Sequence, residues 1–127
     1  MEDKDLLLKD LCLRLPYRVK VQIKNEIVVL DSICDDDGYY FNFIGDNREG
    51  VNIEEIKPYL FPLSSMTEEQ RREFDQIIEL ELKAINNEID RTQVTMFEVD
   101  FYNRHHLDWR GLIPKCLAID ATGLNIY

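Results

Sequence analysis

The sequence predicts an α+β fold in a single domain over residues 1–127. Three observations predict it: leucines recur at helical spacing near the start, apolar and polar residues alternate in the next segments, and a long charged segment carries a narrow apolar stripe. We expect an N-terminal helix, a three- to four-stranded antiparallel meander or small partly open barrel, a long acidic helix packed across it, and a shorter C-terminal helix and tail. The 127 residues, 45% of them hydrophobic, suffice for one buried core.

The segment "DKDLLLKDLCLRL" predicts the first helix. Its leucines recur every three to four residues, and its first turn is acidic, which suits the positive end of the helix dipole. Pro16 ends the helix because the residue before a proline favours an extended backbone. The residues expected on one packed side are Leu7, Leu8, Leu11, Cys12 and Leu15.

Three strands are predicted after this helix. In "YRVKVQIK" apolar residues alternate with polar ones, which predicts one dry and one wet face. The dipeptide "NE" can turn the chain into "IVVLDSIC", and "DDDG", with Gly38 suited to a positive φ, into "YYFNFI". Connections this short make neighbouring strands antiparallel. The acids at residues 35–37 are contiguous rather than alternating as in a calcium-binding EF-hand loop, so they predict a solvated turn.

Two prolines govern the segment "VNIEEIKPYLFPLSSM". Pro58 and Pro62 are incompatible with a long helix and with a central strand. We expect a short strand at Val51, a helical turn over residues 53–56, and an irregular crossing. The side chains expected to pack inward from that crossing are Tyr59, Leu60 and Leu63.

The long helix is predicted over residues 67–91. Thr67 and Gln70 form a capping-box pattern at its start. Eight acids against four bases give the segment a formal charge of −4, so we expect it to cover the meander with an acidic back towards solvent. Its narrow apolar stripe consists of Phe74, Ile78, Leu82, Ile85 and Ile89.

Residues 95–106 are ambiguous, because a Thr95–Glu98 capping pattern competes with side chains that favour strands. We favour a helix there. The tail "KCLAIDATGLNIY" predicts a short strand, a turn at Gly123 and a frayed end.

Twenty-five acidic and fifteen basic residues give a formal charge of −10. This charge repels a phosphate backbone, so direct nucleic-acid binding is not expected. It favours solubility, and it also suits a decoy that occupies a basic site on a partner; composition leaves both interpretations open. The start lacks a signal-peptide pattern and no apolar run approaches the about 18 residues of a membrane span, so we expect a cytoplasmic protein without membrane contact.

The three cysteines, Cys12, Cys34 and Cys116, are far apart and form no C-x-x-C pair. Their spacing and odd number predict reduced thiols rather than a disulfide framework or a zinc site. Their apolar neighbours predict that the thiols are buried and inert.

The segment "NRHHLDWRGLIPK" concentrates the residues that could carry chemistry. Adjacent side chains such as His105 and His106 diverge on a helix and on a strand, so neither geometry favours a shared metal ion, and we expect neither a metal nor a cofactor. A His105–Asp108 dyad would need a nucleophile, and the flanks of Cys116 and Ser65 support none. The sequence contains no G-x-S-x-G elbow, no phosphate-cradling glycine loop and no H-E-x-x-H pair. This favours a protein without enzymatic activity and leaves the question open.

A structural interpretation accounts for the same segment. Asp108 can cap the turn after the helix, Trp109 supplies a large apolar face, and Arg110 can lie across an aromatic ring or pair with an acid of the long helix. Tryptophan, tyrosine and arginine are also the residues that most often contribute interface energy. The candidate binding residues are therefore Tyr102, His105, His106, Asp108, Trp109 and Arg110.

Several blocks resemble a family of short acidic proteins from gut anaerobic bacteria and their phages and mobile elements. The blocks are "LPY", "IKPYLFPLSSMTEEQ" and "NRHHLDWRGLIPKCLAIDA", within which K-P-Y-L-x-P-L-S-S-M and H-H-x-D-[YW]-R-G-L-I are the most specific. Phe61 stands between the two prolines where the family pattern has a basic residue. The resemblance covers most of the chain and implies a setting, a phage or mobile element inside a bacterial cytoplasm, without implying an activity.

Three functional hypotheses follow. The first is a non-enzymatic binding protein that engages a host or element-encoded protein. The second is a binder that sequesters a nucleotide signal, and the third is a metal-assisted hydrolase using His105, His106 and Asp108. In the second, a base would stack on Tyr39, Tyr40, Tyr102 or Trp109, and phosphate would meet Arg104, His106 or Arg110.

Overall fold

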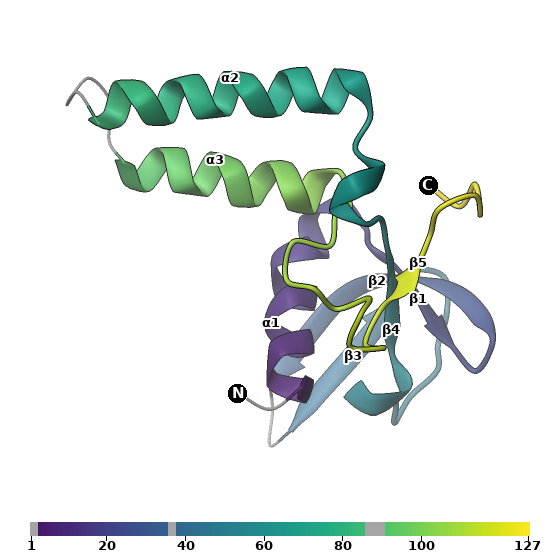
Figure 1. The fold of residues 1–127 in the computed structure, drawn as a ribbon. Helices are drawn as coiled ribbons and strands as arrows, with labels where there is room; N and C mark the ends of the chain where they lie inside the picture. Colours follow the sequence, from purple (N-terminus) through teal and green to yellow (C-terminus); the bar gives the residue numbers. More distant parts are fainter. Residues whose placement is uncertain (1–2, 36–37, 86–90) are drawn as a thin grey trace.

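The computed structural model describes residues 3–35, 38–85 and 91–127. In this part of the chain a five-stranded mixed sheet of order β3-β2-β1-β4-β5 is combined with three α-helices, which confirms the predicted α+β class (Figure 1). The elements are α1 (Asp3–Arg14), β1 (Lys20–Ile23), β2 (Glu26–Asp35), β3 (Tyr39–Phe43), β4 (Lys57–Leu60), α2 (Glu68–Ile85), α3 (Arg91–Arg104) and β5 (Ile119–Asp120).

The predicted antiparallel meander is formed by β1, β2 and β3. The first turn lies one residue earlier than expected: Lys24 and Asn25 both have positive φ, at 51° and 66°, as a two-residue hairpin turn of type I′ requires. Gly38 has the predicted positive φ, at 130°, whereas residues 36 and 37 of the acidic turn lie outside the described residues.

The prediction that prolines keep the segment around Pro58 out of the middle of the sheet is wrong. β4 lies between β1 and β5, and Pro58 is paired with Val21 of β1. The proline is tolerated because β5 pairs only with Tyr59 and Leu60, so Pro58 has a neighbouring strand on one side alone. Tyr59 and Leu60 are buried as expected.

Two further details of this region differ from the prediction. Val51 lies in an irregular segment and not in a strand, while the expected helical turn is the 3-10 helix Ile53–Glu55. Leu63 is 40% exposed because it lies in a second 3-10 turn, Leu63–Ser65, that leads away from the sheet.

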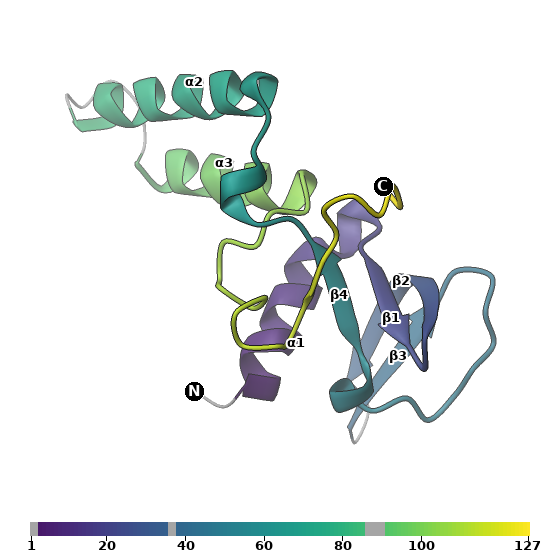
Figure 2. The same cartoon turned by 45° about the vertical axis from the view of Figure 1, so that its right-hand side comes forward.

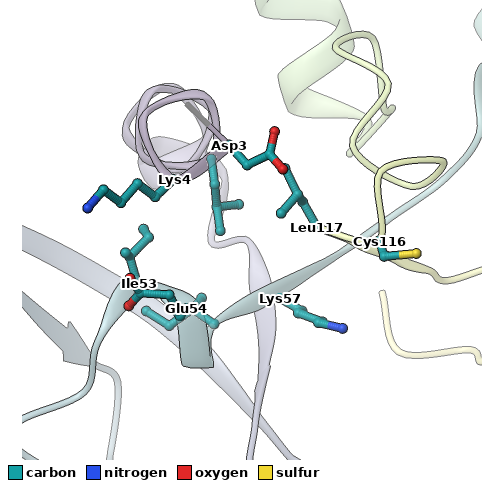
Figure 3. A pocket seen from close by; sticks show the side chains of 9 residues that line it. Asp3, Lys4, Ile53, Glu54, Lys57, Cys116 and Leu117 are labelled. Atoms are coloured by element: carbon teal, nitrogen blue, oxygen red, sulfur yellow. The ribbon is translucent and has the colours of Figure 1, made fainter. Parts of the chain in front are cut away.

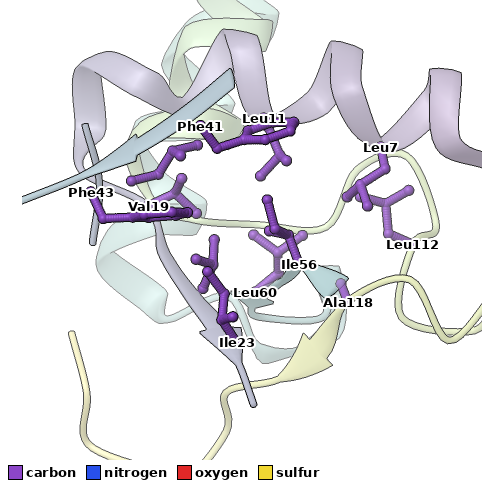
Figure 4. Close-up of a cluster of buried hydrophobic side chains, with 12 residues drawn as sticks. Leu7, Leu11, Val19, Ile23, Phe41, Phe43, Ile56, Leu60, Leu112 and Ala118 are labelled. Atoms are coloured by element: carbon purple, nitrogen blue, oxygen red, sulfur yellow. The ribbon is translucent and has the colours of Figure 1, made fainter. Parts of the chain in front are cut away.

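The sheet is open and not purely antiparallel, because β5 pairs in parallel with β4. The long connection through α2 and α3 makes this parallel pairing possible. α1 packs on the sheet and contributes Leu7 and Leu11 to the core, while Leu8 is half-buried and Cys12 is exposed (Figure 4). The core cluster consists of Leu7, Leu11, Val19, Val21, Ile23, Leu30, Phe41, Phe43, Ile56, Leu60, Leu112 and Ala118.

α2 and α3 form a helical hairpin that extends from one end of the sheet (Figures 1 and 2). The capping box is confirmed: the Gln70 N–H donates to Thr67 Oγ1 over 3.1 Å, and the Thr67 N–H donates to Gln70 Oε1 over 2.9 Å. α2 follows the short connection from β4 and runs beside α3, so in both views it projects from the end of the sheet and does not lie across the meander as expected.

A second apolar cluster joins this hairpin to the body. Ile77, Phe101 and Leu107 are its buried members, and Phe74 packs against them. The predicted stripe of α2 holds for Phe74 and Ile78, which are half-buried, but Leu82 is 57% exposed. Ile89 lies outside the described residues.

The helix predicted over residues 95–106 is confirmed as far as Arg104. It begins at Arg91, so Thr95 lies within the helix and not at its start. Among the described residues, none of the helices is both long enough and apolar enough for a membrane span.

Candidate functional site

The segment after α3 forms a corner that is attached to the end of β4. The Phe61 N–H donates to the His106 carbonyl and the Asp108 N–H donates to the Phe61 carbonyl, each over 2.8 Å. These bonds make a parallel bridge between Phe61 and Leu107. The corner therefore continues the sheet's hydrogen bonding beyond β4.

Asp108 has the capping role expected of it. The residue is 7% exposed, and its carboxylate accepts hydrogen bonds from the backbone N–H groups of Leu112, over 2.8 Å, and Ile113, over 2.9 Å. Both oxygens are thus used to hold the following turn.

Trp109 is half-buried and bonded to a side chain. Its Nε1–H donates to Oδ1 of Asn103 over 3.1 Å, and Asn103 is only 2% exposed. The indole stacks on Tyr102 with 6.0 Å between centroids, and the Arg110 guanidinium lies 4.2 Å from the indole centroid. The structure therefore brings Tyr102, Trp109 and Arg110 together. Of the two placements expected for Arg110, the structure shows the one across an aromatic ring.

The two histidines diverge, as expected for adjacent residues. The His105 ring contacts Phe101 at 4.8 Å, and its Nε2 lies 3.3 Å from Glu73 Oε1. The His106 ring stacks on Tyr127, with 3.7 Å between centroids and 15° between planes. Burial, with the nearby charges of Arg14, His105 and Lys20, lowers the pKa of His106 to about 4, so the ring is neutral at pH 7. Among the described residues, no three His, Cys, Asp or Glu side chains are grouped so that they could hold a metal ion.

A buried ion pair under the corner was missed by the sequence analysis. Arg14 and Asp10 are both 0% exposed, with Arg14 Nε 2.7 Å from Asp10 Oδ2. Arg14 also donates through Nη2 to the Leu107 carbonyl over 2.6 Å, which ties α1 to the corner. Burial raises the pKa of Asp10, and Arg14 and Arg110 oppose that shift. The signal was the spacing of Leu7, Asp10, Leu11 and Arg14, which places all four on one helix face.

Tyr127 is the second residue that was missed, and the prediction of a frayed end is wrong for it. Its hydroxyl accepts the Lys20 N–H and donates to the Tyr59 carbonyl, each over 2.8 Å. Burial raises the pKa of this phenol to about 12. The tyrosine therefore bridges β1 and β4 beyond the last residues that these strands pair directly.

The prediction of buried thiols is also wrong, since Cys12, Cys34 and Cys116 are all free and exposed. Cys12 follows the buried Leu11 and so points away from the core, although partial burial still raises the pKa of its thiol.

Among the hollows along α1, two also reach residues between 110 and 117. One, of about 170 Å³, lies between the start of α1, the 3-10 turn at Ile53 and the Cys116–Leu117 segment (Figure 3). The other, of about 590 Å³, is lined by side chains of α1 together with Tyr39 and Arg110. Of the residues considered for a nucleotide, Tyr39 and Arg110 thus share a hollow, whereas Arg104 pairs with Glu73 and His106 stacks on Tyr127.

Comparisons of the chain with models of protein families, with curated proteins and with solved structures give no match.

Proposed function

We propose that this protein is a non-enzymatic binding protein that engages another protein through the α2–α3 hairpin. The observation that carries the proposal is a groove of about 290 Å³ between the two helices. Ile77, Leu80 and Phe97 supply its apolar lining, and Phe97 is 45% exposed. Met96, the neighbour of Phe97, is 64% exposed. An apolar groove between two helices suits an amphipathic helix laid into it.

The charge of the hairpin indicates which kind of helix fits. Six acids against three bases give α2 a formal charge of −3, and the whole chain carries −10. Glu73 and Asp100 line the groove itself, where Glu73 pairs with Arg104 and Asp100 accepts a hydrogen bond from the Tyr17 hydroxyl. The proposed occupant is therefore an amphipathic helix of a host or element-encoded protein, with basic residues flanking its apolar stripe.

The corner residues support this proposal by being engaged within the fold. The Asp108 carboxylate accepts hydrogen bonds from two backbone N–H groups, and the His106 ring stacks on Tyr127. The Trp109 N–H donates to Asn103. These contacts leave fewer groups for a nucleotide signal and favour protein binding over the nucleotide alternative. The resemblance to proteins of gut bacteria and their phages suggests that the partner is met in a bacterial cytoplasm.

Site-specific photocrosslinking tests the proposal. A benzophenone side chain is introduced at Met96, beside the groove, or at Leu124, which is 47% exposed and lies in the tail outside the hairpin. After irradiation in native cytoplasmic extract, we expect Met96 to give one dominant adduct, mapped by mass spectrometry to a basic amphipathic helix, and Leu124 to give none. Adducts of equal yield from both positions, or none from Met96, would contradict the proposal.

A further inference from the structure

We propose that the groove between α1 and the start of β3 binds a small monoanionic carboxylate carried on an apolar body. This site is separate from the α2–α3 groove and does not depend on the proposed protein binding. The groove measures about 590 Å³, within the range of roughly 300–1,000 Å³ that ligand pockets occupy. The side chains that line it are Asp5, Leu8, Lys9, Cys12, Leu13, Tyr39 and Arg110.

The apolar part of the site comes from a second apolar face of α1. Leu7 and Leu11 face the core, Leu8 packs against the edge of the core and also lines the groove, and Leu13, which is 42% exposed, lines the groove as well. A helix that is apolar on more than one side is normally covered on each of them. Tyr39 of β3, which is 53% exposed, lines the groove opposite α1 and adds apolar surface.

The groove continues beyond this opening. A neighbouring hollow of about 190 Å³ shares Asp5, Leu8 and Tyr39 with it and extends along α1 to Ile53. Leu8, Tyr39 and Ile53 give this continuation an apolar side, beside the charged Lys4, Asp5 and Glu54, along which an alkyl or aryl body can lie.

Arg110 supplies the group that recognises the carboxylate. Its side chain is 18% exposed and its guanidinium is held against Trp109, 4.2 Å from the ring centroid. The nearest carboxylate is Asp10, 3.4 Å from Arg110 Nε, but Asp10 already accepts two hydrogen bonds from Arg14. Arg110 Nε is buried and faces Asp10, so Arg110 meets a ligand through the part of its side chain that lines the groove. A planar guanidinium in this position matches a carboxylate.

The charges of the groove select a monoanion. Lys9 and Arg110 bring two positive charges and Asp5 brings one negative charge, which leaves a single positive charge in a chain whose total is −10. One carboxylate balances this charge, whereas a doubly charged phosphate would leave an excess negative charge in a partly apolar groove. The proposed ligand class is therefore an alkyl or aryl carboxylic acid.

Protection of Cys12 from a maleimide tests the site, with decanoate as the probe and decanol as the matched uncharged molecule. Cys12 lines the groove, while Cys34 is exposed elsewhere and serves as the control within the same chain. We expect decanoate to slow labelling of Cys12 saturably and to leave Cys34 unchanged, and decanol to need a roughly tenfold higher concentration, since a charge-assisted hydrogen bond is lost.

Two variants alter the proposed carboxylate site, and a third, in the α2–α3 groove, serves as a control. Arg110→Met and, independently, Lys9→Met are expected to weaken protection by decanoate, with the larger loss for Arg110→Met; Lys9 is exposed, so its replacement spares the fold. Phe97→Glu, in the other groove, is expected to leave protection unchanged, which separates this site from the proposed protein binding. Equal protection by decanol and decanoate, or full protection in both Arg110→Met and Lys9→Met, would overturn the proposal.

Discussion

The ring of His106 lies almost flat against the ring of Tyr127, with 3.7 Å between their centroids and 15° between their planes. The stack joins two segments that are 21 positions apart, and the Tyr127 hydroxyl extends the contact to β1 and β4. An imidazole in this place is held neutral, because burial and the charges of Arg14, His105 and Lys20 all disfavour its protonated form.

This stack predicts a loss of stability in mild acid. The pKa of His106 is about 4 in the folded protein, below the ordinary histidine value of 6.5. Above pH 6.5 the histidine is neutral in both the folded and the unfolded protein, so it does not change the free energy of unfolding. As the pH falls towards 4, the unfolded chain takes up the proton first, and the free energy of unfolding therefore decreases. We expect a contribution of about 2–3 kcal/mol between pH 7 and pH 4.5. Urea unfolding of the protein and of His106→Gln at both pH values measures it. An identical pH dependence in the two proteins would rule out this assignment.

Tyr127→Phe tests the bridge between β1 and β4. The variant keeps the ring on His106 but removes the partner of the Lys20 N–H and of the Tyr59 carbonyl. We expect the free energy of unfolding to fall by about 1–2 kcal/mol, measured by chemical denaturation. Tyr40→Phe, at a position 54% exposed on β3, is the matched control and should change little. Equal stability of both variants would indicate a tail that contributes no bridge.

The buried ion pair predicts a large asymmetry between single and double substitution. Arg14→Met leaves the buried Asp10 with only the more distant Arg110, 3.4 Å away, and the Leu107 carbonyl without its donor, so we expect a loss of about 3–5 kcal/mol. The double variant Asp10→Leu with Arg14→Met should recover much of this loss, because neither charge of this pair then remains buried. Arg48→Met, which breaks surface ion pairs with Glu26 and Asp46, should cost far less. Thermal and urea unfolding compare all three. A double variant less stable than Arg14→Met would count against this view of the pair.

Asp108→Ala tests whether the corner depends on its cap. Two N–H groups, of Leu112 and Ile113, lose a charged acceptor in a buried turn, and we expect a loss of about 2–4 kcal/mol in unfolding experiments. Asp120→Ala removes a similar turn contact to the Thr122 N–H, but at an exposed position where water replaces it, so the loss should be much smaller. Similar losses from both substitutions would show that burial does not increase the contribution of the Asp108 cap to the free energy of unfolding.

The parts of the fold that sequence predicted well are those set by local pattern. The leucine spacing of α1, the alternation in β1 and the Thr67–Gln70 capping box each depend on residues within a few positions of one another. β4 was misjudged because the cost of a proline in a sheet depends on whether a second strand flanks it, and that is decided by β5, far along the chain.

The candidate site shows the same division. Capping by Asp108 and the divergence of the two histidines follow from short-range geometry and were predicted. The contributions of Arg14 and Tyr127 were not, because a charged residue is normally expected at the surface and a terminal residue is normally expected to be poorly ordered. The positions of these side chains depend on contacts between residues that are far apart in the sequence. Arg14 contacts Leu107, 93 positions away, and Tyr127 contacts Lys20 and Tyr59, 107 and 68 positions away.

The central claim is that the α2–α3 hairpin binds the partner, whereas the corner around Trp109 maintains the fold. The most direct test of this claim is the yield of the Met96 photocrosslinked adduct in two further variants. Trp109→Phe alters the corner and keeps a ring against Tyr102, and Phe97→Glu places a charge in the groove of the hairpin. We predict that the yield is retained in Trp109→Phe and abolished in Phe97→Glu, with both proteins folded by circular dichroism. A yield abolished by Trp109→Phe and retained in Phe97→Glu would contradict the proposal and assign recognition to the corner.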